Sequence, residues 1–173
     1  MSKPKLIMMC GTSGSGKTYF SKLLESRGFV RLSIDEELWP DFYVLSDVLT
    51  PEHKAFLKKQ GIERLKSRAA NFAAEGKSVV IDMCFCHKAQ RDEFRAFGES
   101  LGAEPVLIYM KASLPVLKER LADRAGKNGP NSLPVSEEEL LRFWGGFQPP
   151  KGEGEVVIDS EKPFDIDEIL KSI

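Results

Sequence analysis

The sequence predicts an α/β fold: a five-stranded parallel sheet covered by helices on both faces, in three layers. Two observations predict it. The apolar runs are continuous rather than alternating, as expected of strands covered on both faces. Segments with helical spacing separate these runs, so that each strand is followed by a crossover helix. A chain of 173 residues can bury a core of its own. We therefore expect a single domain over residues 1–173.

Five segments are the predicted strands. The strongest are uninterrupted apolar runs, at 6–10, 78–81 and 105–110. A weaker run at 29–34 contains Arg31 and Ser33, so we expect it near an edge of the sheet. The last predicted strand, at 156–158, lies near the C-terminus.

Helical spacing fills the intervals between the strands. Helices are predicted at 18–27, 51–75, 88–101, 115–124, directly after Ser136, and at 164–173. Thr50 before Pro51 is a typical helix start, and Ser136 with Glu139 forms a capping-box pattern. The Gly, Pro and Asn residues between Arg124 and Ser136 predict a mobile loop.

Composition excludes several classes of protein. The chain has 25 Lys+Arg against 26 Asp+Glu, a net charge of −1, with 42% hydrophobic residues. These values exclude collagen-like, disordered and disulfide-scaffold proteins, and argue against a general nucleic-acid binder. The odd count of three cysteines predicts free thiols rather than a zinc site. Without an apolar stretch of about 20 residues we expect no membrane span, and we expect a cytoplasmic protein.

Residues 11–18 match the pattern G-x-x-x-x-G-K-[ST] at every position. The motif follows a predicted strand and opens a predicted helix, which is the context that the pattern requires. Its glycines allow a tight turn whose N–H groups face phosphate oxygens, at the positive end of the helix. The predicted nucleotide ligands are Gly11, Ser13, Gly14, Ser15, Gly16, Lys17 and Thr18. Lys17 would reach the β- and γ-phosphates, and Thr18 would bind Mg²⁺.

The expected nucleotide is ATP, with Mg²⁺. The N-K-x-D motif of common GTPases does not occur in the sequence. A D-x-x-G match at 123–126 lies at a helix end rather than after a strand, so we interpret it as coincidence.

Two acids follow predicted strands. Asp35 lies 18 residues after Lys17 and ends the next strand, and Asp82 follows the run at 78–81. The carboxyl ends of parallel strands face the phosphate loop, so Asp35 is the predicted general base and Asp82 a ligand of Mg²⁺ or substrate. Asp35 and Glu36 together could instead activate water, as in an ATPase.

Two arginines suggest a lid. Arg120 and Arg124 are four residues apart and project from one helix face, directly before the Gly-rich loop. We expect a small lid over about residues 120–136, whose arginines offset charge on the transferred phosphoryl group. The simpler alternative is a solvated helix with Glu119 and Asp123 as ion-pair partners.

The chain resembles the P-loop kinases that include chloramphenicol phosphotransferase, zeta toxins, gluconate kinase and polynucleotide 5′-kinase. The matching segments are 11–18, 33–35, 80–82, 119–124, 147–150 and 155–159. The resemblance implies a P-loop fold, ATP with Mg²⁺, and transfer to a hydroxyl, with Asp35 as the base. It also implies that 147–150 lies near the adenine.

One departure from this family concerns the substrate. Leu38 occupies the position where polynucleotide kinases and zeta toxins carry an Arg, and residues 32–50 contain no Lys or Arg. An acidic rim with interleaved aromatics suits a neutral or cationic small molecule bearing a hydroxyl. The predicted substrate contacts are Asp35, Trp39, Phe42, Tyr43, Asp82 and Arg91. A basic helix beyond the rim keeps nucleic-acid 5′-hydroxyl and nucleotide-sugar acceptors open, and the oligomeric state is not predicted.

Overall fold

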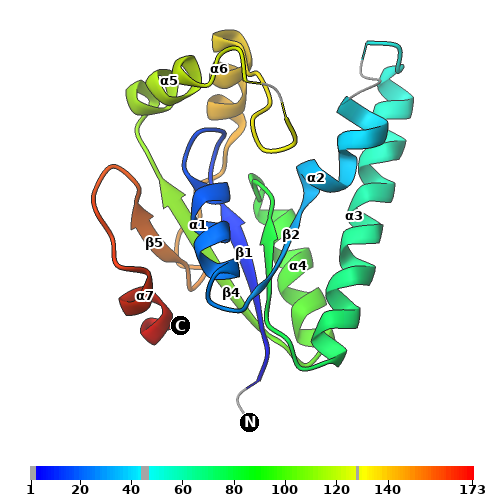
Figure 1. Ribbon diagram of the computed structural model, residues 1–173, viewed down its shortest axis with the longest axis vertical. Coiled ribbons are helices and arrows are strands. Elements are labelled where there is room, and N and C mark those ends of the chain that lie inside the picture. The colour runs from blue at the N-terminus through cyan, green and yellow to red at the C-terminus, as the bar shows by residue number, and fades with distance from the viewer. Residues whose placement is uncertain (1–2, 44–46, 128) are drawn as a thin grey trace.

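The computed structural model describes residues 3–43, 47–127 and 129–173, and the side chain of Tyr43 lies outside this description. Five parallel strands form one sheet in the order β2-β3-β1-β4-β5 (Figure 1). Their bounds are Lys5–Cys10 (β1), Val30–Ser33 (β2), Val79–Asp82 (β3), Glu104–Lys111 (β4) and Val156–Asp159 (β5). The predicted parallel sheet is confirmed, and β2 lies at its edge as expected.

The helices follow the predicted pattern, with one addition after β2. They are α1 (Lys17–Glu25), α2 (Ile34–Leu38), the π-helical turn η1 (Trp39–Tyr43), α3 (Pro51–Ala74), α4 (Lys88–Ser100), α5 (Leu114–Asp123), α6 (Glu137–Gly146) and α7 (Ile166–Ser172). The caps act as predicted. Thr50 Oγ1 accepts a hydrogen bond from the His53 N–H at 3.2 Å. Ser136 and Glu139 form both bonds of a capping box.

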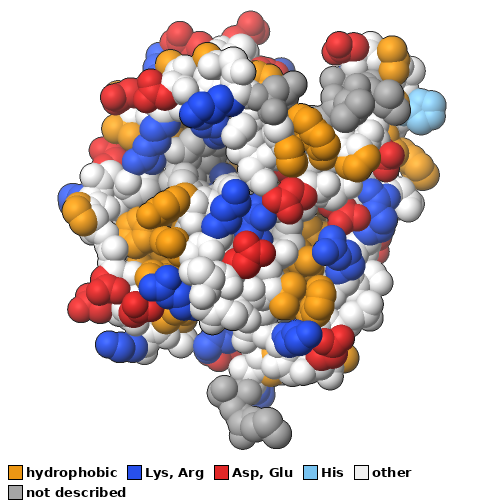
Figure 2. Space-filling view, in the orientation of Figure 1, with side chains coloured by type: hydrophobic (Ala, Val, Ile, Leu, Met, Phe, Trp, Pro, Cys, Tyr) orange, Lys and Arg blue, Asp and Glu red, His pale blue; other side chains and the backbone are white. Residues whose placement is uncertain are grey.

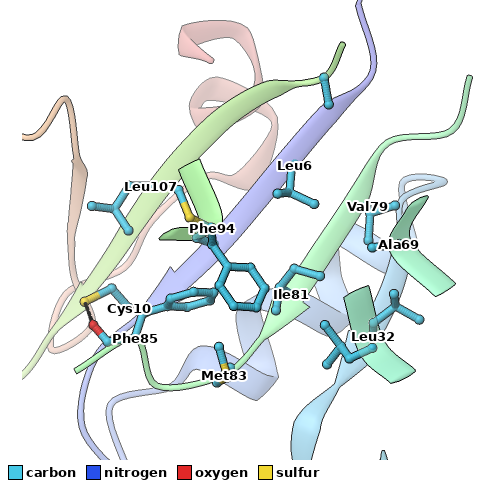
Figure 3. Close-up of a cluster of buried hydrophobic side chains, with 13 residues drawn as sticks. Leu6, Cys10, Leu32, Ala69, Val79, Ile81, Met83, Phe85, Phe94 and Leu107 are labelled. Atoms are coloured by element: carbon cyan, nitrogen blue, oxygen red, sulfur yellow. Dashed lines mark hydrogen bonds between the residues drawn. The ribbon is translucent and has the colours of Figure 1, made fainter. Parts of the chain in front are cut away.

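The sheet has helices on both faces, because side chains alternate along each strand. In β1, Leu6 and Met8 belong to the cluster that contains residues of α3 and α4. Ile7 and Met9 belong to the opposite cluster, which contains residues of α1 and α7. Figure 3 shows the first cluster, with the side chains of β1, β3 and β4 against those of the helices. The three-layer α/β fold is therefore confirmed.

A separate small cluster joins α5 to α6. Its buried members are Ala112, Leu117, Leu121 and Leu140. In Figure 1 these two helices lie together beyond the carboxyl end of the sheet, beside the phosphate-loop end of β1. The pair is thus packed as a unit outside the two main clusters.

The segment after β2 differs from the sequence prediction. We expected a strand through residue 34, but β2 ends at Ser33, and α2 and η1 follow at once. Ser33 is the cap of α2, since its Oγ accepts the Glu36 N–H at 3.4 Å. Three acidic residues occupy the first turn of α2, where the helix dipole favours negative charge. The pattern Ser33-x-x-Glu36 was the available signal.

Close packing fixes α2 against α3. Gly61 is buried in α3, and a Cβ built there would lie 2.5 Å from Leu38 Cδ2 and 3.6 Å from Ile34 Cδ1. Only glycine allows the side chains of α2 to approach the α3 backbone this closely. The position of α2, which carries Asp35, therefore depends on Gly61.

We expect Gly61→Ala to destabilise the protein by about 1–3 kcal/mol, because the added methyl group overpacks the α2–α3 contact. This loss outweighs the helix-propensity gain of up to about 1 kcal/mol. The measurement is urea unfolding followed by circular dichroism. Gly145→Ala in α6 is the matched control, since a Cβ there meets nothing within 4 Å among the described residues. Equal stability of Gly61→Ala and wild type would contradict the close contact.

Candidate active site

The phosphate loop leaves the carboxyl end of β1 and opens α1 at Lys17. Gly11 has φ +147°, and a Cβ there would lie 2.5 Å from Ser15 Oγ and 2.8 Å from the Met110 carbonyl oxygen. The loop is therefore too tight for a side chain at this position. Lys17 Nζ donates a hydrogen bond to the Thr12 carbonyl at 2.8 Å, which holds the ammonium group over the loop.

The same loop fits a phosphate ligand. Ser15 Oγ is buried and has no hydrogen-bond partner among the described residues. A buried hydroxyl without a partner is unfavourable, so it has donor capacity for a bound anion. The N-terminus of α1 and the Lys17 ammonium supply positive potential at this place. Each predicted nucleotide ligand belongs to this loop or to the first turn of α1.

Asp35 lies just after the carboxyl end of β2 and Asp82 lies at that of β3, at the end of the sheet that also bears the phosphate loop. Strand β3 runs between β1 and β2, and its last residue, Asp82, is in register with Ser33 of β2. Asp82 is buried, and its Oδ2 accepts a hydrogen bond from Ser21 Oγ at 3.0 Å. Ser21 lies one turn beyond Thr18 in α1. Half-buried Asp35 follows the end of β2, in the first turn of α2.

Arg31 contacts several of the groups at this end of the sheet, and the sequence did not predict it as a site residue. Its side chain is only 4% exposed. It donates to Ser21 Oγ at 2.9 Å, Asp82 Oδ2 at 2.7 Å, Glu36 Oε1 at 2.7 Å and Asn131 Oδ1 at 3.0 Å. Arg31 thus links α1, β3, α2 and the α5–α6 loop. In the sequence, Arg31 stands out as an arginine within an apolar strand, but this pattern predicted only that the strand lies at the edge of the sheet.

Glu36 is held as a carboxylate by this network. Burial alone would raise the pKa of Glu36, but the hydrogen bonds from Arg31 and Asn131 outweigh it and lower the pKa below its ordinary value. Both bonds fall on Oε1, at 2.7 and 2.6 Å. The Glu36 carboxylate is therefore engaged in ion pairing, in contrast to its predicted alternative role beside Asp35.

The two predicted lid arginines have different surroundings. Arg120 donates to the Gly14 carbonyl at 3.2 Å and to the Ser160 carbonyl at 2.7 Å, so it ties the phosphate loop to the residue after β5. Arg124 donates from Nη2 to the Asn131 carbonyl at 3.2 Å. Its Nε is buried and has no partner among the described residues. Arg124 thus retains a buried donor, whereas Arg120 makes several hydrogen bonds.

The prediction that Arg91 lines a substrate pocket is wrong. Its side chain is 1% exposed and forms a two-point ion pair with Glu153, at 2.9 and 2.7 Å. Nη1 also donates to the carbonyls of Phe85 at 3.0 Å and Gln148 at 2.9 Å. Arg91 therefore joins the loop after β3 to the segment before β5, within the protein interior.

The loop after β3 supports the phosphate loop directly. The Gly11 N–H donates to the Cys84 carbonyl at 3.1 Å. Phe85 adopts φ +45°, a left-handed conformation that is costly for a side chain of this size. Its ring packs edge-on against Phe94, and the Cys10 thiol donates to its carbonyl (Figure 3). The three cysteines are free thiols, as predicted.

Segment 147–150 docks on this same loop. The Gln148 N–H donates to the Cys86 carbonyl at 2.9 Å, and Gln148 Oε1 accepts the Lys88 N–H at 2.9 Å. The Phe147 ring packs against Tyr109 in β4. The segment that the resemblance associates with adenine thus contacts the loop after β3, which is itself bonded to the phosphate loop through Gly11.

The acidic rim is neutralised by the helix that follows it. Glu37 pairs with Arg64 at 2.8 Å and with Arg68 at 2.9 Å, and Asp41 lies 4.0 Å from Arg64. Figure 2 shows acidic and basic side chains intermixed over α2 and α3 rather than in separate patches. The expectation that the stretch 32–50 presents an unbalanced acidic field is therefore corrected, because α3 supplies the opposite charges.

The rim aromatics do not share one environment. Phe42 is 7% exposed, with the Lys58 ammonium 5.1 Å from its ring centroid, so it packs between η1 and α3. This burial contradicts the prediction that Phe42 contacts substrate. Trp39 is half-buried at the start of η1. The predicted substrate contact of Tyr43 falls on a side chain outside the described residues.

Within the described residues, no group of three or more His, Cys, Asp and Glu side chains is arranged to hold a metal ion. Ser21, one turn after Thr18 in α1, contacts Asp82, so a hydroxyl and a carboxylate lie on neighbouring elements. Oxygen ligands of these two kinds suit a magnesium ion that takes its other ligands from phosphate and water. In the same part of the chain, no helix combines the length and the apolar character that crossing a bilayer requires.

Comparison with known proteins gives concordant results. The family model described as an AAA domain, AAA_33, matches residues 6–150. A presumed kinase from Chloroflexus aurantiacus j-10-fl is similar with a TM-score of 0.77 and 23% identity, over 99% of this chain and 94% of that chain. A gluconokinase from Sinorhizobium meliloti 1021 gives 0.65 and 21%, over 99% and 90%. A chain of the Pnkp1/Rnl/Hen1 RNA repair complex gives 0.69 and 16%, over 84% and 44%. At these identities the likeness shows the fold.

Proposed function

Since the chain belongs to the AAA domain family AAA_33, we propose that it is an ATP-dependent kinase that phosphorylates a hydroxyl of a small molecule. The observation that carries this proposal is that the phosphate loop and Asp35 lie at the same end of the sheet. The phosphate loop follows β1, and Asp35 follows β2, with β3 between them. A phosphate cradle and a carboxylate on the same edge are what transfer to a hydroxyl requires. The kinase neighbours support a phosphotransferase in general terms.

The proposed roles follow from the geometry. In this proposal the loop amides, Ser15 and Lys17 hold the phosphates of ATP, and Thr18 and Asp82 would hold Mg²⁺. Bound Mg²⁺ would offset charge on the β- and γ-phosphoryl oxygens. Arg31 and Ser21 both donate to Asp82 Oδ2, which leaves Oδ1 for the ion or a water molecule in its shell.

In the proposed transfer, the acceptor oxygen forms a bond to the γ-phosphorus while the bond from that phosphorus to the β,γ-bridging oxygen breaks. ADP leaves, and Asp35 accepts the hydroxyl proton. The α5–α6 loop acts as the lid in this proposal, and Arg124, whose Nε has no hydrogen-bond partner among the described residues, is the proposed donor to the developing charge. Arg120 acts indirectly in this proposal, because it holds the phosphate loop in place by donating a hydrogen bond to the Gly14 carbonyl.

Transfer to the 5′-hydroxyl of a nucleic acid is the second candidate. It is favoured by the likeness to a chain of an RNA repair complex and by the basic side chains of α3. We prefer the small molecule because Arg64 and Arg68 of α3 are paired with Glu37. Paired arginines release fewer counterions and bind phosphate backbones less well.

Labelled ATP separates these candidates. The protein is incubated with [γ-³²P]ATP and Mg²⁺ together with a panel of sugars, sugar acids, nucleosides, hydroxylated antibiotics and 5′-hydroxyl oligonucleotides. The proposal expects the label on a small molecule, and expects none with Lys17→Met, which serves as the negative control. Label on the oligonucleotide alone would establish the second candidate. Release of labelled phosphate with no labelled acceptor would indicate an ATPase.

A further inference from the structure

Asn131 connects the α5–α6 loop to the elements around Asp35. Its Nδ2 donates to Glu36 Oε1 at 2.6 Å. Its Oδ1 accepts from Arg31 Nη2 at 3.0 Å and from Ser33 Oγ at 3.2 Å. Arg31 and Ser33 belong to β2, and Glu36 belongs to α2 next to the proposed base. One amide group therefore joins the loop to both elements.

The backbone of Asn131 holds Arg124. The Asn131 carbonyl accepts from Arg124 Nη2 at 3.2 Å, while Arg124 Nε is buried without a partner among the described residues. Asn131 thus contacts the proposed charge-stabilising arginine with its main chain and the residue next to the proposed base with its side chain. Asn131 therefore contacts both of these parts of the proposed site.

The chemistry of the contact requires an amide. Glu36 presents a carboxylate that needs donors, whereas Arg31 and Ser33 present donors that need an acceptor. Asparagine offers both kinds of group on one short side chain, and aspartate offers acceptors only. Alanine offers neither.

We propose that Asn131 is a positioning residue for phosphoryl transfer: it fixes the α5–α6 loop and Arg124 against α2, so that the acceptor rather than water meets the γ-phosphorus. The inference rests on the proposed kinase function. A loop held in place excludes water from the reacting groups, and a loop set free admits it. Loss of the contact should therefore lower transfer to the acceptor and raise the share of ATP lost to hydrolysis.

A reciprocal exchange tests this proposal. Asn131→Asp places a second carboxylate against Glu36, and we expect the kcat of transfer to fall by about 10²-fold, with hydrolysis now the larger fraction. The double variant Glu36→Gln/Asn131→Asp restores one donor and one acceptor with the partners reversed. It should recover transfer to within about 10-fold of wild type, as residues in direct contact show in double-mutant cycles. Ser132→Ala, at the next loop position, is the matched control.

Amide hydrogen exchange of the loop supplies a readout that needs no acceptor. We expect protection of the α5–α6 loop to be lost in Asn131→Asp and regained in the double variant, with all variants still folded by circular dichroism. Unchanged exchange in Asn131→Asp would overturn the contact. Altered exchange with unchanged transfer and hydrolysis would overturn the positioning role. A wild-type protein that labels no acceptor would refute the kinase function, while the exchange data would still judge the contact.

Discussion

Asp35→Asn is expected to lower phosphoryl transfer by about 10²–10⁴-fold, the usual contribution of a general base. The substitution preserves the shape of the side chain and removes its capacity to take the hydroxyl proton. Binding of ATP should stay close to the wild-type level, because the phosphate loop lies two strands away across β3. The decisive comparison is the kcat of transfer with the identified acceptor beside the Kd for an ATP analogue.

The neighbouring acid makes this test specific. Glu36 Oε1 accepts hydrogen bonds from Arg31 and Asn131, so Glu36 acts in the ion-pair network and is left unchanged in this test. Asp41→Asn is the matched control: it removes a carboxylate from the same stretch at an exposed position, and we expect unimpaired transfer. If Asp35→Asn transferred phosphate at the wild-type rate, the assignment of the base would be wrong.

Arg91→Ala is expected to destabilise the protein by about 3–5 kcal/mol, because it leaves the buried Glu153 carboxylate with only the more distant Arg95, at 3.8 Å, as an ion-pair partner. It also removes the donor to the carbonyls of Phe85 and Gln148. The measurement is the free energy of unfolding from urea denaturation at pH 7. Arg27→Ala is the matched control with a much smaller expected loss, since Arg27 forms a comparable two-point ion pair with exposed Asp167.

The same ion pair predicts a pH dependence. The hydrogen bond from Arg91 lowers the pKa of Glu153 below its ordinary value of 4.5, against the opposing effect of burial. A carboxyl with a lowered pKa stabilises the folded state fully above pH 4.5, and this contribution is lost as the pH falls through the folded-state pKa. Glu153→Gln should therefore be less stable than wild type at pH 7, and the difference should shrink on acidification. A constant difference between pH 7 and pH 3 would contradict this.

Local patterns predicted the sheet and most helices because both depend on short-range properties. The continuous apolar runs became β1, β3 and β4, and the caps at Thr50 and Ser136 mark real helix starts. The turn into α2 was missed because Ile34 extends an apolar run, and the Ser33 cap carried too little weight against it. The glycines and Lys17 of the phosphate loop could be predicted as nucleotide ligands because their chemistry requires a contiguous motif.

The features that could not be predicted from the sequence are contacts between residues far apart along the chain. Arg91 finds Glu153 across 62 positions, and Arg31 finds Asn131 across 100. No local pattern indicates which charge meets which. For the same reason the acidic stretch seemed unbalanced in the sequence, although Glu37 pairs with arginines of α3 some 30 positions later. The charges along one stretch of sequence therefore do not indicate which ligand it binds, because the fold can pair them with opposite charges from another segment.

The strand order also sets the distance between the phosphate loop and the proposed base. Two strand intervals separate β1, which leads into the phosphate loop, from β2, which leads into α2 and the proposed base Asp35. Neighbouring strands are about 4.8 Å apart, so the two backbones are about 10 Å apart. The γ-phosphoryl group and the attacking hydroxyl must share that span above the end of β3. If the proposed function holds, this short span favours an acceptor whose hydroxyl is sterically open over one whose hydroxyl is recessed between bulky substituents.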